Sequence, residues 1–158
     1  MRHSRRVVIT GMGVVTSLGE SLDQFWSALC SGKSGVGPLT LFDTTEFKVK
    51  FGGQVRDWDP AARFGVKEAR HLDRFAQFAL AAATSAIEDS GIDFRGMPPE
   101  QCGVLIGSGI GGLNEFEAQH TVMMEKGPSR ISPFTIPKLM VNAASGQVSI
   151  KCGLNNQR

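Results

Sequence analysis

The chain has 158 residues, 41% of them apolar, and a formal net charge of +2, which fits one domain or a piece of a larger fold. Its charges are mixed and no apolar run nears the ~20 residues of a membrane span, so neither nucleic acid nor a bilayer is expected as partner. The basic start leads into an apolar run, Val7 to Ile9, too short for a signal peptide, and a cytoplasmic location is expected.

The first predicted elements are a buried strand and a capped helix. Arg6 to Thr10, RVVIT, is an apolar run of strand length. Ser21 followed by Gln24 forms a capping box, which predicts the start of a helix. The helix is expected to stop at Gly32 and Gly35. Its apolar residues recur at helical spacing and form one stripe: Leu22, Phe25, Trp26 and Leu29.

The middle of the chain is predicted to be irregular and then helical. Between Gly37 and Asp59, two strand-like pieces, Phe47 to Phe51 and Gln54 to Trp58, indicate a hairpin or an excursion from the main sheet. Lys67 to Ser90 holds a period of 3.6 residues over four turns, and Gly91 follows as its C′ residue. The face of this helix is rich in alanine, so neighbouring backbones are expected to approach it closely.

The second half alternates a strand with helices. Cys102 to Ile106 is a predicted strand, and Asn114 to Lys126 is a predicted helix that ends at Gly127. Pro137 suits the first turn of a last helix, Lys138 to Ile150. This alternation predicts an α/β fold with a largely parallel sheet.

Gly107 to Gly112, GSGIGG, matches the G-x-G-x-x-G fingerprint of dinucleotide-binding loops. That fingerprint requires a second strand that ends in an acidic residue about 20 residues later. Here a helix and a turn occupy that interval. Gly11 to Thr16 is a second near-match with the same defect. Close packing or the approach of a substrate therefore explains the glycines better, and Ile110 is the single apolar side chain among them.

No residue stands out as a nucleophile or metal ligand. Cys30, Cys102 and Cys152 are too widely spaced for a disulfide framework or a metal site, and no cofactor is expected. Cys152 has no histidine in a context that pairs with it. His120 is predicted to be an exposed helix residue.

A small basic cluster lies at a predicted helix start. Lys67, Arg70 and His71 form it, and a solvated surface is its plain interpretation. Cations are not favoured at the positive end of a helix dipole, so the cluster also hints at an anionic partner.

Five blocks resemble a known family. In chain order they are RRVVITGMGVVTSLG, SLDQFWSALCSGKSG, LFDTTEFKVKFGGQV, GVLIGSGIGGL and RISPFTIPKLMVNAASG. Together they resemble the amino-terminal part of the condensing β-ketoacyl-[acyl carrier protein] synthases, in particular the type II elongating enzyme of dissociated bacterial fatty acid synthesis. The resemblance covers Arg5 to Leu154.

The resemblance implies a fold and a reaction. The fold is thiolase-like, with two similar halves stacked as five α-β-α-β-α layers in a homodimer, and this chain holds only the amino-terminal portion. The reaction is a decarboxylative Claisen condensation. A cysteine takes an acyl chain from the carrier protein, and malonyl carrier protein then loses CO₂ and attacks the thioester, supported by two histidines and a lysine of the carboxy-terminal half.

The end of the chain departs from the family pattern. Asn156 stands where the family has Gly, Gln157 stands where it has Pro, and the chain ends at Arg158. The nucleophile would lie about ten residues or fewer further on. We therefore expect residues 1–158 to be a ketosynthase-like segment truncated before the catalytic cysteine, inactive alone and marginally stable or insoluble, because apolar layer faces stay uncovered.

The resemblance assigns binding residues. Ile110 matches the gate of the acyl pocket, and Phe134 and Thr135 match its lining; the family often has a second aromatic where Thr135 stands. A basic patch that docks the acidic carrier protein is expected from four residues, with histidine in place of a usual basic residue at one of them: Lys67, Arg70, His71 and Arg130.

The expected partners are acyl carrier protein bearing an acyl or malonyl thioester and, in the full-length family, a second copy of the chain. Two other interpretations stay open. One is a non-catalytic module that binds carrier protein or a ketosynthase, and the other is a fragment of a polyketide-type ketosynthase.

Overall fold

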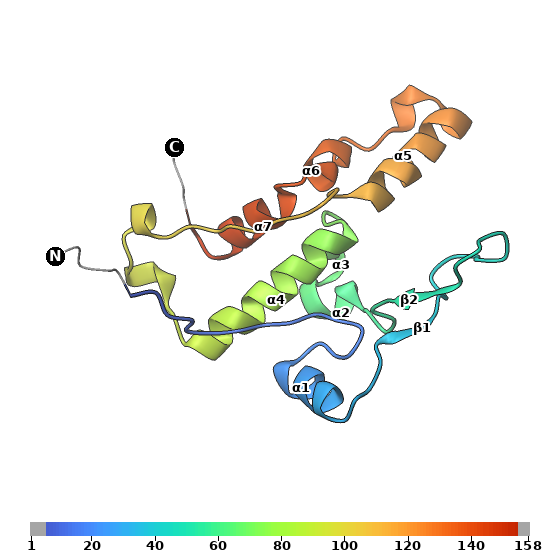
Figure 1. Cartoon of the computed structure of the whole chain (residues 1–158). Helices are drawn as coiled ribbons and strands as arrows, with labels where there is room; N and C mark the ends of the chain where they lie inside the picture. The colour runs from blue at the N-terminus through green and yellow to red at the C-terminus, as the bar shows by residue number, and fades with distance from the viewer. Residues whose placement is uncertain (1–5, 155–158) are drawn as a thin grey trace. The chain divides into compact units, whose positions relative to one another are not determined.

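A computed structural model describes residues 6–154 (Figure 1). These residues form two compact units. The first unit comprises residues 6–54 and 82–92, and the second comprises residues 55–81 and 93–154. In chain order the elements are α1 (Leu22–Cys30), β1 (Val36–Pro38), β2 (Phe51–Gly53), α2 (Pro60–Phe64), α3 (Val66–Ala69), α4 (Arg74–Ser90), the 3-10 turns η1 (Phe94–Gly96) and η2 (Pro99–Gln101), α5 (Leu113–Lys126), η3 (Pro128–Arg130), α6 (Thr135–Leu139) and α7 (Ala143–Lys151).

Helix α1 begins at the predicted cap. Ser21 Oγ accepts a hydrogen bond from the Gln24 N–H at 3.3 Å. Gln24 Oε1 in turn accepts a hydrogen bond at 3.1 Å from the N–H of Glu20 rather than from that of Ser21. The helix ends at Cys30, and Gly32 follows with φ of +68°, a conformation that favours glycine. The predicted start and end of this helix are confirmed.

A short hairpin follows in the first unit. β1 pairs antiparallel with β2, with Val36 opposite Gly53 and Pro38 opposite Phe51. The Gln54 side chain ties the end of β2 to the segment after β1, because its Nε2 donates to Thr40 Oγ1 at 2.8 Å. A hairpin was one of the two predicted alternatives, but its strands lie at Val36–Pro38 and Phe51–Gly53 rather than at Phe47 to Phe51 and Gln54 to Trp58.

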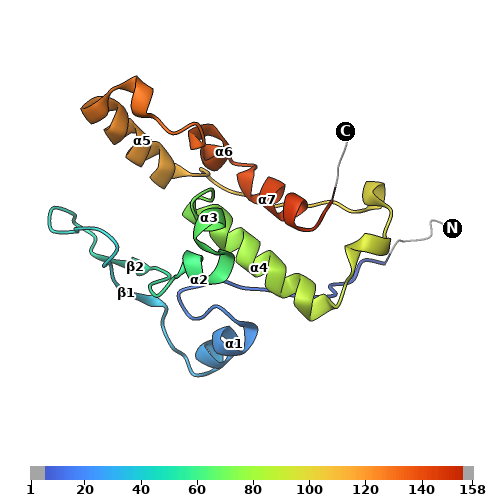
Figure 2. The ribbon, with the colours of Figure 1, turned by 180° about the vertical axis from the view of Figure 1, so that it is seen from behind.

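The two predicted core strands are not formed. Arg6 to Thr10 and Cys102 to Ile106 are coil in the structure and are drawn as coil in both ribbon views (Figures 1 and 2). Neither segment makes a backbone hydrogen bond to another described residue, and a strand exists only where a neighbour supplies that ladder. The predicted parallel sheet is therefore absent from residues 6–154, where β1 and β2 form the one sheet.

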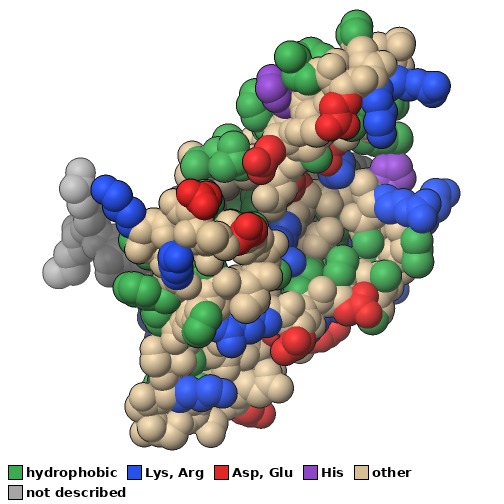
Figure 3. Space-filling model, turned by 90° about the vertical axis from the view of Figure 1, so that its right-hand side faces the viewer, with side chains coloured by type: hydrophobic (Ala, Val, Ile, Leu, Met, Phe, Trp, Pro, Cys, Tyr) green, Lys and Arg blue, Asp and Glu red, His purple; other side chains and the backbone are tan. Residues whose placement is uncertain are grey.

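Apolar side chains of these segments stay exposed. Val7 is 90% exposed, Ile9 83% and Leu105 100%, although residues of this type normally fill a core. The face drawn in Figure 3 likewise shows apolar side chains at the surface, among charged ones. Large exposed apolar surfaces mark sites of association or aggregation, which is the liability that the sequence predicts.

Two predicted helices are each divided in the structure. The helix expected over Lys67 to Ser90 is two helices, because the chain leaves α3 after Ala69 and Asp73 begins α4 by accepting the Gln77 N–H on its carbonyl. The helix expected over Lys138 to Ile150 is likewise interrupted, between the end of α6 at Leu139 and the start of α7 at Ala143. Pro137 is the third residue of α6, so its place in a first turn is confirmed.

The second unit contains most of the buried side chains. Leu80, at 2% exposure, is buried from α4, and Ala144 and Val148 are buried from α7. Trp58 is also buried, and its Nε1–H donates to Gln77 Oε1 at 2.8 Å. This bond satisfies the polar end of a large ring that would otherwise lose its contact with water.

In the first unit, a glycine-containing segment lies directly against α4. The Met12 N–H donates to Asp89 Oδ2 at 2.9 Å. A Cβ atom placed on Gly13 would lie 2.0 Å from the carbonyl oxygen of Ala82, and one on Gly11 would lie 2.1 Å from that of Ala86. The predicted close approach of backbone to the alanine-rich helix is confirmed here. None of the described helices is both long and apolar enough to cross a membrane.

Candidate functional site

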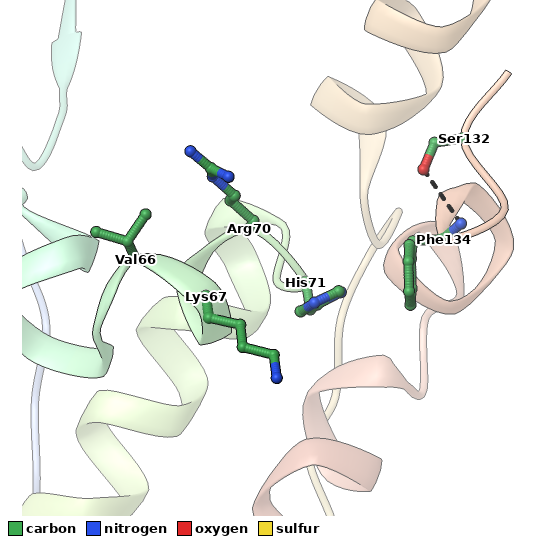
Figure 4. Close-up of a pocket in the computed structure, with 6 residues that line it drawn as sticks. All are labelled: Val66, Lys67, Arg70, His71, Ser132 and Phe134. Carbon is green, nitrogen blue, oxygen red and sulfur yellow. Dashed lines mark hydrogen bonds between the residues drawn. The ribbon is translucent and has the colours of Figure 1, made fainter. Parts of the chain in front are cut away.

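A pocket of about 520 Å³ in the second unit brings together residues from two parts of the chain. α3 and the residues after it supply one wall, and the loop before α6 supplies the other (Figure 4). Six residues line the pocket: Val66, Lys67, Arg70, His71, Ser132 and Phe134. The structure therefore places four residues that the sequence predicts for two different tasks around one cavity.

The two walls meet at an aromatic contact. The rings of His71 and Phe134 lie edge to face, with centroids 4.3 Å apart, and Figure 4 shows them pointing toward one another. The backbone of Phe134 is anchored to Ser132, because the Phe134 N–H donates a hydrogen bond to Ser132 Oγ at 3.2 Å. A residue predicted for the acyl pocket thus contacts one predicted for carrier-protein docking.

The pocket rim is basic. Lys67 and Arg70 are exposed, and neither forms an ion pair with a described residue. The carboxylate of Glu68, between them in sequence, instead lies 3.8 Å from Lys151 Nζ. Two cations are therefore available to a ligand, and the aromatic rings of His71 and Phe134 line the same pocket.

The glycine loop stands apart from this pocket. Ile110 is 65% exposed and is not among the pocket's described lining residues. Behind it, the Gly112 N–H donates to the Leu139 carbonyl at 3.0 Å. Gly111, at φ of +82°, would bring an added Cβ to 2.5 Å from that same oxygen. These glycines are required because the loop touches the backbone of α6.

Two further predicted residues lie elsewhere. Thr135 is the first residue of α6, and its Oγ1 donates to the Ser132 carbonyl at 2.7 Å. Arg130 lines a separate hollow with Val122 and Lys126. The structure does not join either to the pocket of His71 and Phe134.

A buried polar cluster that the sequence patterns did not predict lies next to the glycine loop. Asp73 Oδ2 accepts the Glu115 N–H at 2.9 Å, and the Glu115 carboxylate forms an ion pair with Lys138. Asp73 and Glu115 are buried. An aspartate directly before an apolar helix is an N-cap signal, but it was hidden inside the long helix predicted from Lys67.

None of the cysteines is placed as an activated nucleophile. Cys30 is exposed, Cys102 is buried, and burial raises the pKa of the Cys152 thiol, which disfavours its reactive thiolate. Within residues 6–154, no three His, Cys, Asp or Glu side chains are grouped as metal ligands would be. The predicted departure at Asn156 and Gln157 lies outside the described residues.

Comparison with known proteins assigns the fold to a family. The family model described as "Beta-ketoacyl synthase, N-terminal domain" matches residues 4–156. A ketosynthase solved with a type II polyketide acyl-carrier protein superimposes with a TM-score of 0.78 at 21% identity, over 98% of this chain and 40% of that one. The predicted thiolase-like fold class, of which this chain holds the amino-terminal portion, is thereby confirmed.

Curated relatives agree with this result. The chain is 44% identical over 151 residues to "3-oxoacyl-[acyl-carrier-protein] synthase 2" of Synechocystis sp., covering 96% of this chain and 36% of the relative. It is 47% identical over 152 residues to the protein of the same name from Coxiella burnetii, covering 96% of this chain and 37% of the relative. The chain thus spans little more than a third of the length of these relatives.

Proposed function

Because the chain belongs to the β-ketoacyl synthase family, we propose that it is the carrier-protein-docking and acyl-contacting segment of a 3-oxoacyl-[acyl carrier protein] synthase. The pocket of His71 and Phe134 carries this proposal, since exposed cations and an aromatic wall share one cavity. An acyl carrier protein matches both features: its acidic side chains suit the cations, and its thioester-linked acyl chain suits the aromatic wall. The names of the relatives, 3-oxoacyl-[acyl-carrier-protein] synthase 2, give that substrate class.

In this proposal, Lys67 and Arg70 bind acidic side chains of the carrier protein. Charge-assisted contacts of this kind fix register and speed association more than they add affinity. His71 extends the basic patch and at the same time orients Phe134. Arg130, with Lys126 beside it, is a further basic contact outside the pocket. The solved ketosynthase of the same fold is itself in complex with an acyl-carrier protein.

The acyl chain is proposed to contact Ile110, Phe134 and Thr135. The exposed side chains of Ile110 and Phe134 support this role, because burying their apolar surface against a hydrocarbon chain lowers the free energy. Fatty acyl chains are proposed as the substrate class because the relatives at 44% and 47% identity are named 3-oxoacyl-[acyl-carrier-protein] synthase 2, the type of enzyme that the resemblance links to fatty acid synthesis.

We further propose that residues 1–158 bind but do not condense. Condensation breaks the thioester carbon–sulfur bond of an acyl-cysteine while malonyl carrier protein loses CO₂ and forms the new carbon–carbon bond. The resemblance places that cysteine, its two histidines and its lysine outside these 158 residues. The raised pKa of the Cys152 thiol argues against a substitute nucleophile.

Charge reversal at the pocket rim is expected to weaken carrier-protein binding. The double variant Lys67→Glu/Arg70→Glu should raise the dissociation constant for acyl carrier protein by about tenfold or more at low salt, because two attractive contacts become repulsive. Titration calorimetry at two salt concentrations measures it. The matched control, Lys33→Glu/Lys48→Glu, makes the same change of net charge in the other unit and should change binding about twofold or less. Equal losses in both double variants would contradict the docking site.

The purified chain is expected to form no acyl-enzyme. Incubated with acyl and malonyl carrier protein, it should show no mass increase by intact-protein mass spectrometry and release no β-ketoacyl product. A complete 3-oxoacyl synthase under the same conditions is the positive control. An acyl adduct on any of Cys30, Cys102 or Cys152 would refute the proposal that this chain binds without chemistry.

A further inference from the structure

The start of α5 has no cap of its own. The first amides of a helix lack an intrahelical acceptor and are normally satisfied by a side chain at the N-cap. Here the N-cap is Gly112, which has none. An added Cβ at Gly112 would lie 2.5 Å from the carbonyl oxygen of Lys138, so the close approach of α6 leaves no room for a capping side chain. The acceptor must come from elsewhere.

Asp73 supplies that acceptor from 42 residues away. Its Oδ2 accepts the N–H of Glu115, the third residue of α5, at 2.9 Å. Its Oδ1 accepts the Phe75 N–H in the first turn of α4 at 3.4 Å. The side chain is buried, so the bond to Glu115 is shielded from water, while the bond to Phe75 is part-buried. One carboxylate therefore caps two helices, and its charge suits the positive end of both dipoles.

The loop that carries Ile110 enters α5 at this capped end. The Gly111 N–H donates to Ser108 Oγ at 3.1 Å, and the Gly112 N–H donates to the Leu139 carbonyl. Ile110 itself is exposed and has no such anchor in its own side chain. Its position is therefore set by where the backbone of residues 111–115 is held.

We infer that Asp73 is a positioning residue for the Ile110 loop. By binding the Glu115 amide, Asp73 holds the start of α5 against α4 and α6. This contact fixes the position of the loop backbone, and with it the position of the Ile110 side chain. The consequence for an acyl chain rests on the proposed function, because only there does Ile110 contact substrate. The positioning itself is a property of the backbone and is measured without substrate.

The test separates the two caps. Asp73→Ser keeps a good N-cap for α4, because a serine hydroxyl serves its own helix as well as a carboxylate does, but it is too short to reach Glu115. Asp73→Ala removes both caps. Amide hydrogen exchange by mass spectrometry should rise about tenfold or more over residues 110–116 in both variants, the factor expected for losing a hydrogen bond to a charged group. Exchange in the first turn of α4 should rise in the alanine variant alone.

A matched control is Asp93→Ser. Asp93 is an exposed aspartate that caps η1 through the Arg95 N–H at 3.0 Å, so its variant should leave residues 110–116 unchanged. If Asp73→Ser does not fold by circular dichroism, Asp73→Gly takes its place, since glycine is a tolerated N-cap for α4 and has no side chain that could reach Glu115. Unchanged exchange over residues 110–116, or an equal rise in every helix, would overturn the inference.

A photoreactive acyl-pantetheine serves as a second readout. If it labels Ile110 in the original chain, labelling should fall about tenfold in Asp73→Ser, and undiminished labelling would overturn the inference. If it labels nothing while the exchange result holds, the acyl-contact proposal fails and the positioning role of Asp73 is supported on its own.

Discussion

Replacing Gly13 with alanine is expected to lower the free energy of unfolding by about 1–3 kcal/mol, the usual range for overpacking. The added methyl would lie 2.0 Å from the Ala82 carbonyl oxygen and 2.8 Å from the Ala86 nitrogen. Both are backbone atoms of α4, so no side-chain rotation relieves the overlap. The segment must move off the helix and lose the Met12 to Asp89 hydrogen bond. Urea unfolding followed by circular dichroism measures the change.

The same substitution elsewhere provides the control. Gly146 lies inside α7, and a Cβ placed there meets nothing within 4 Å. Gly146→Ala should therefore raise the free energy of unfolding by about 0.5–1 kcal/mol, because alanine is the better helix former. If Gly13→Ala proves as stable as Gly146→Ala, the close approach of the glycine segment to α4 is wrong.

Breaking the buried ion pair should have a larger effect. Lys138→Met is expected to lower the free energy of unfolding by about 3–5 kcal/mol, because it leaves the Glu115 carboxylate buried without a partner. The side chains of Glu115 and Lys138 are only 7% and 17% exposed. The double variant Glu115→Leu/Lys138→Met should recover most of the loss, since it removes both charges and keeps the Glu115 backbone amide that Asp73 binds.

An exposed pair gives the comparison for this prediction. Lys151 and Glu68 lie 3.8 Å apart, with 54% and 40% of their side chains exposed. Lys151→Met should change the free energy of unfolding by about 0–1 kcal/mol, because water and salt screen such pairs. Equal losses from Lys138→Met and Lys151→Met in urea unfolding would mean that the pair of Glu115 is not shielded from solvent.

Local patterns were sufficient for several parts of the fold. The capping box of Ser21 and Gln24 gave the start of α1, and Gly127, at φ of +84°, ends α5 where predicted. The alanines of the helix before Gly91 indicated a surface for close backbone approach, and Gly11 and Gly13 do pack there. These features depend on residues within one turn or on the size of a single side chain, so the sequence alone contains them.

Other features depend on partners that are distant in sequence. RVVIT and Cys102 to Ile106 have strand composition, but composition supplies no hydrogen-bonding neighbour, and both are coil in residues 6–154. The helical period did not reveal the break between α3 and α4 at Asp73, because Leu72 and Phe75 continue the apolar pattern across it. Only the position of α5 shows why an aspartate stands there.

The sequence by itself therefore determined the family, the glycine loop and the choice of Ile110, Phe134 and the basic residues as candidates. Its motifs are contiguous and their residue types are specific. Only the tertiary structure decided that His71 meets Phe134 in one pocket, that Ile110 and Arg130 lie outside it, and that Asp73 caps α5. The two contacts, His71 with Phe134 and Asp73 with Glu115, join residues that are 63 and 42 positions apart. A contact of that range depends on how helices pack, which no local pattern specifies.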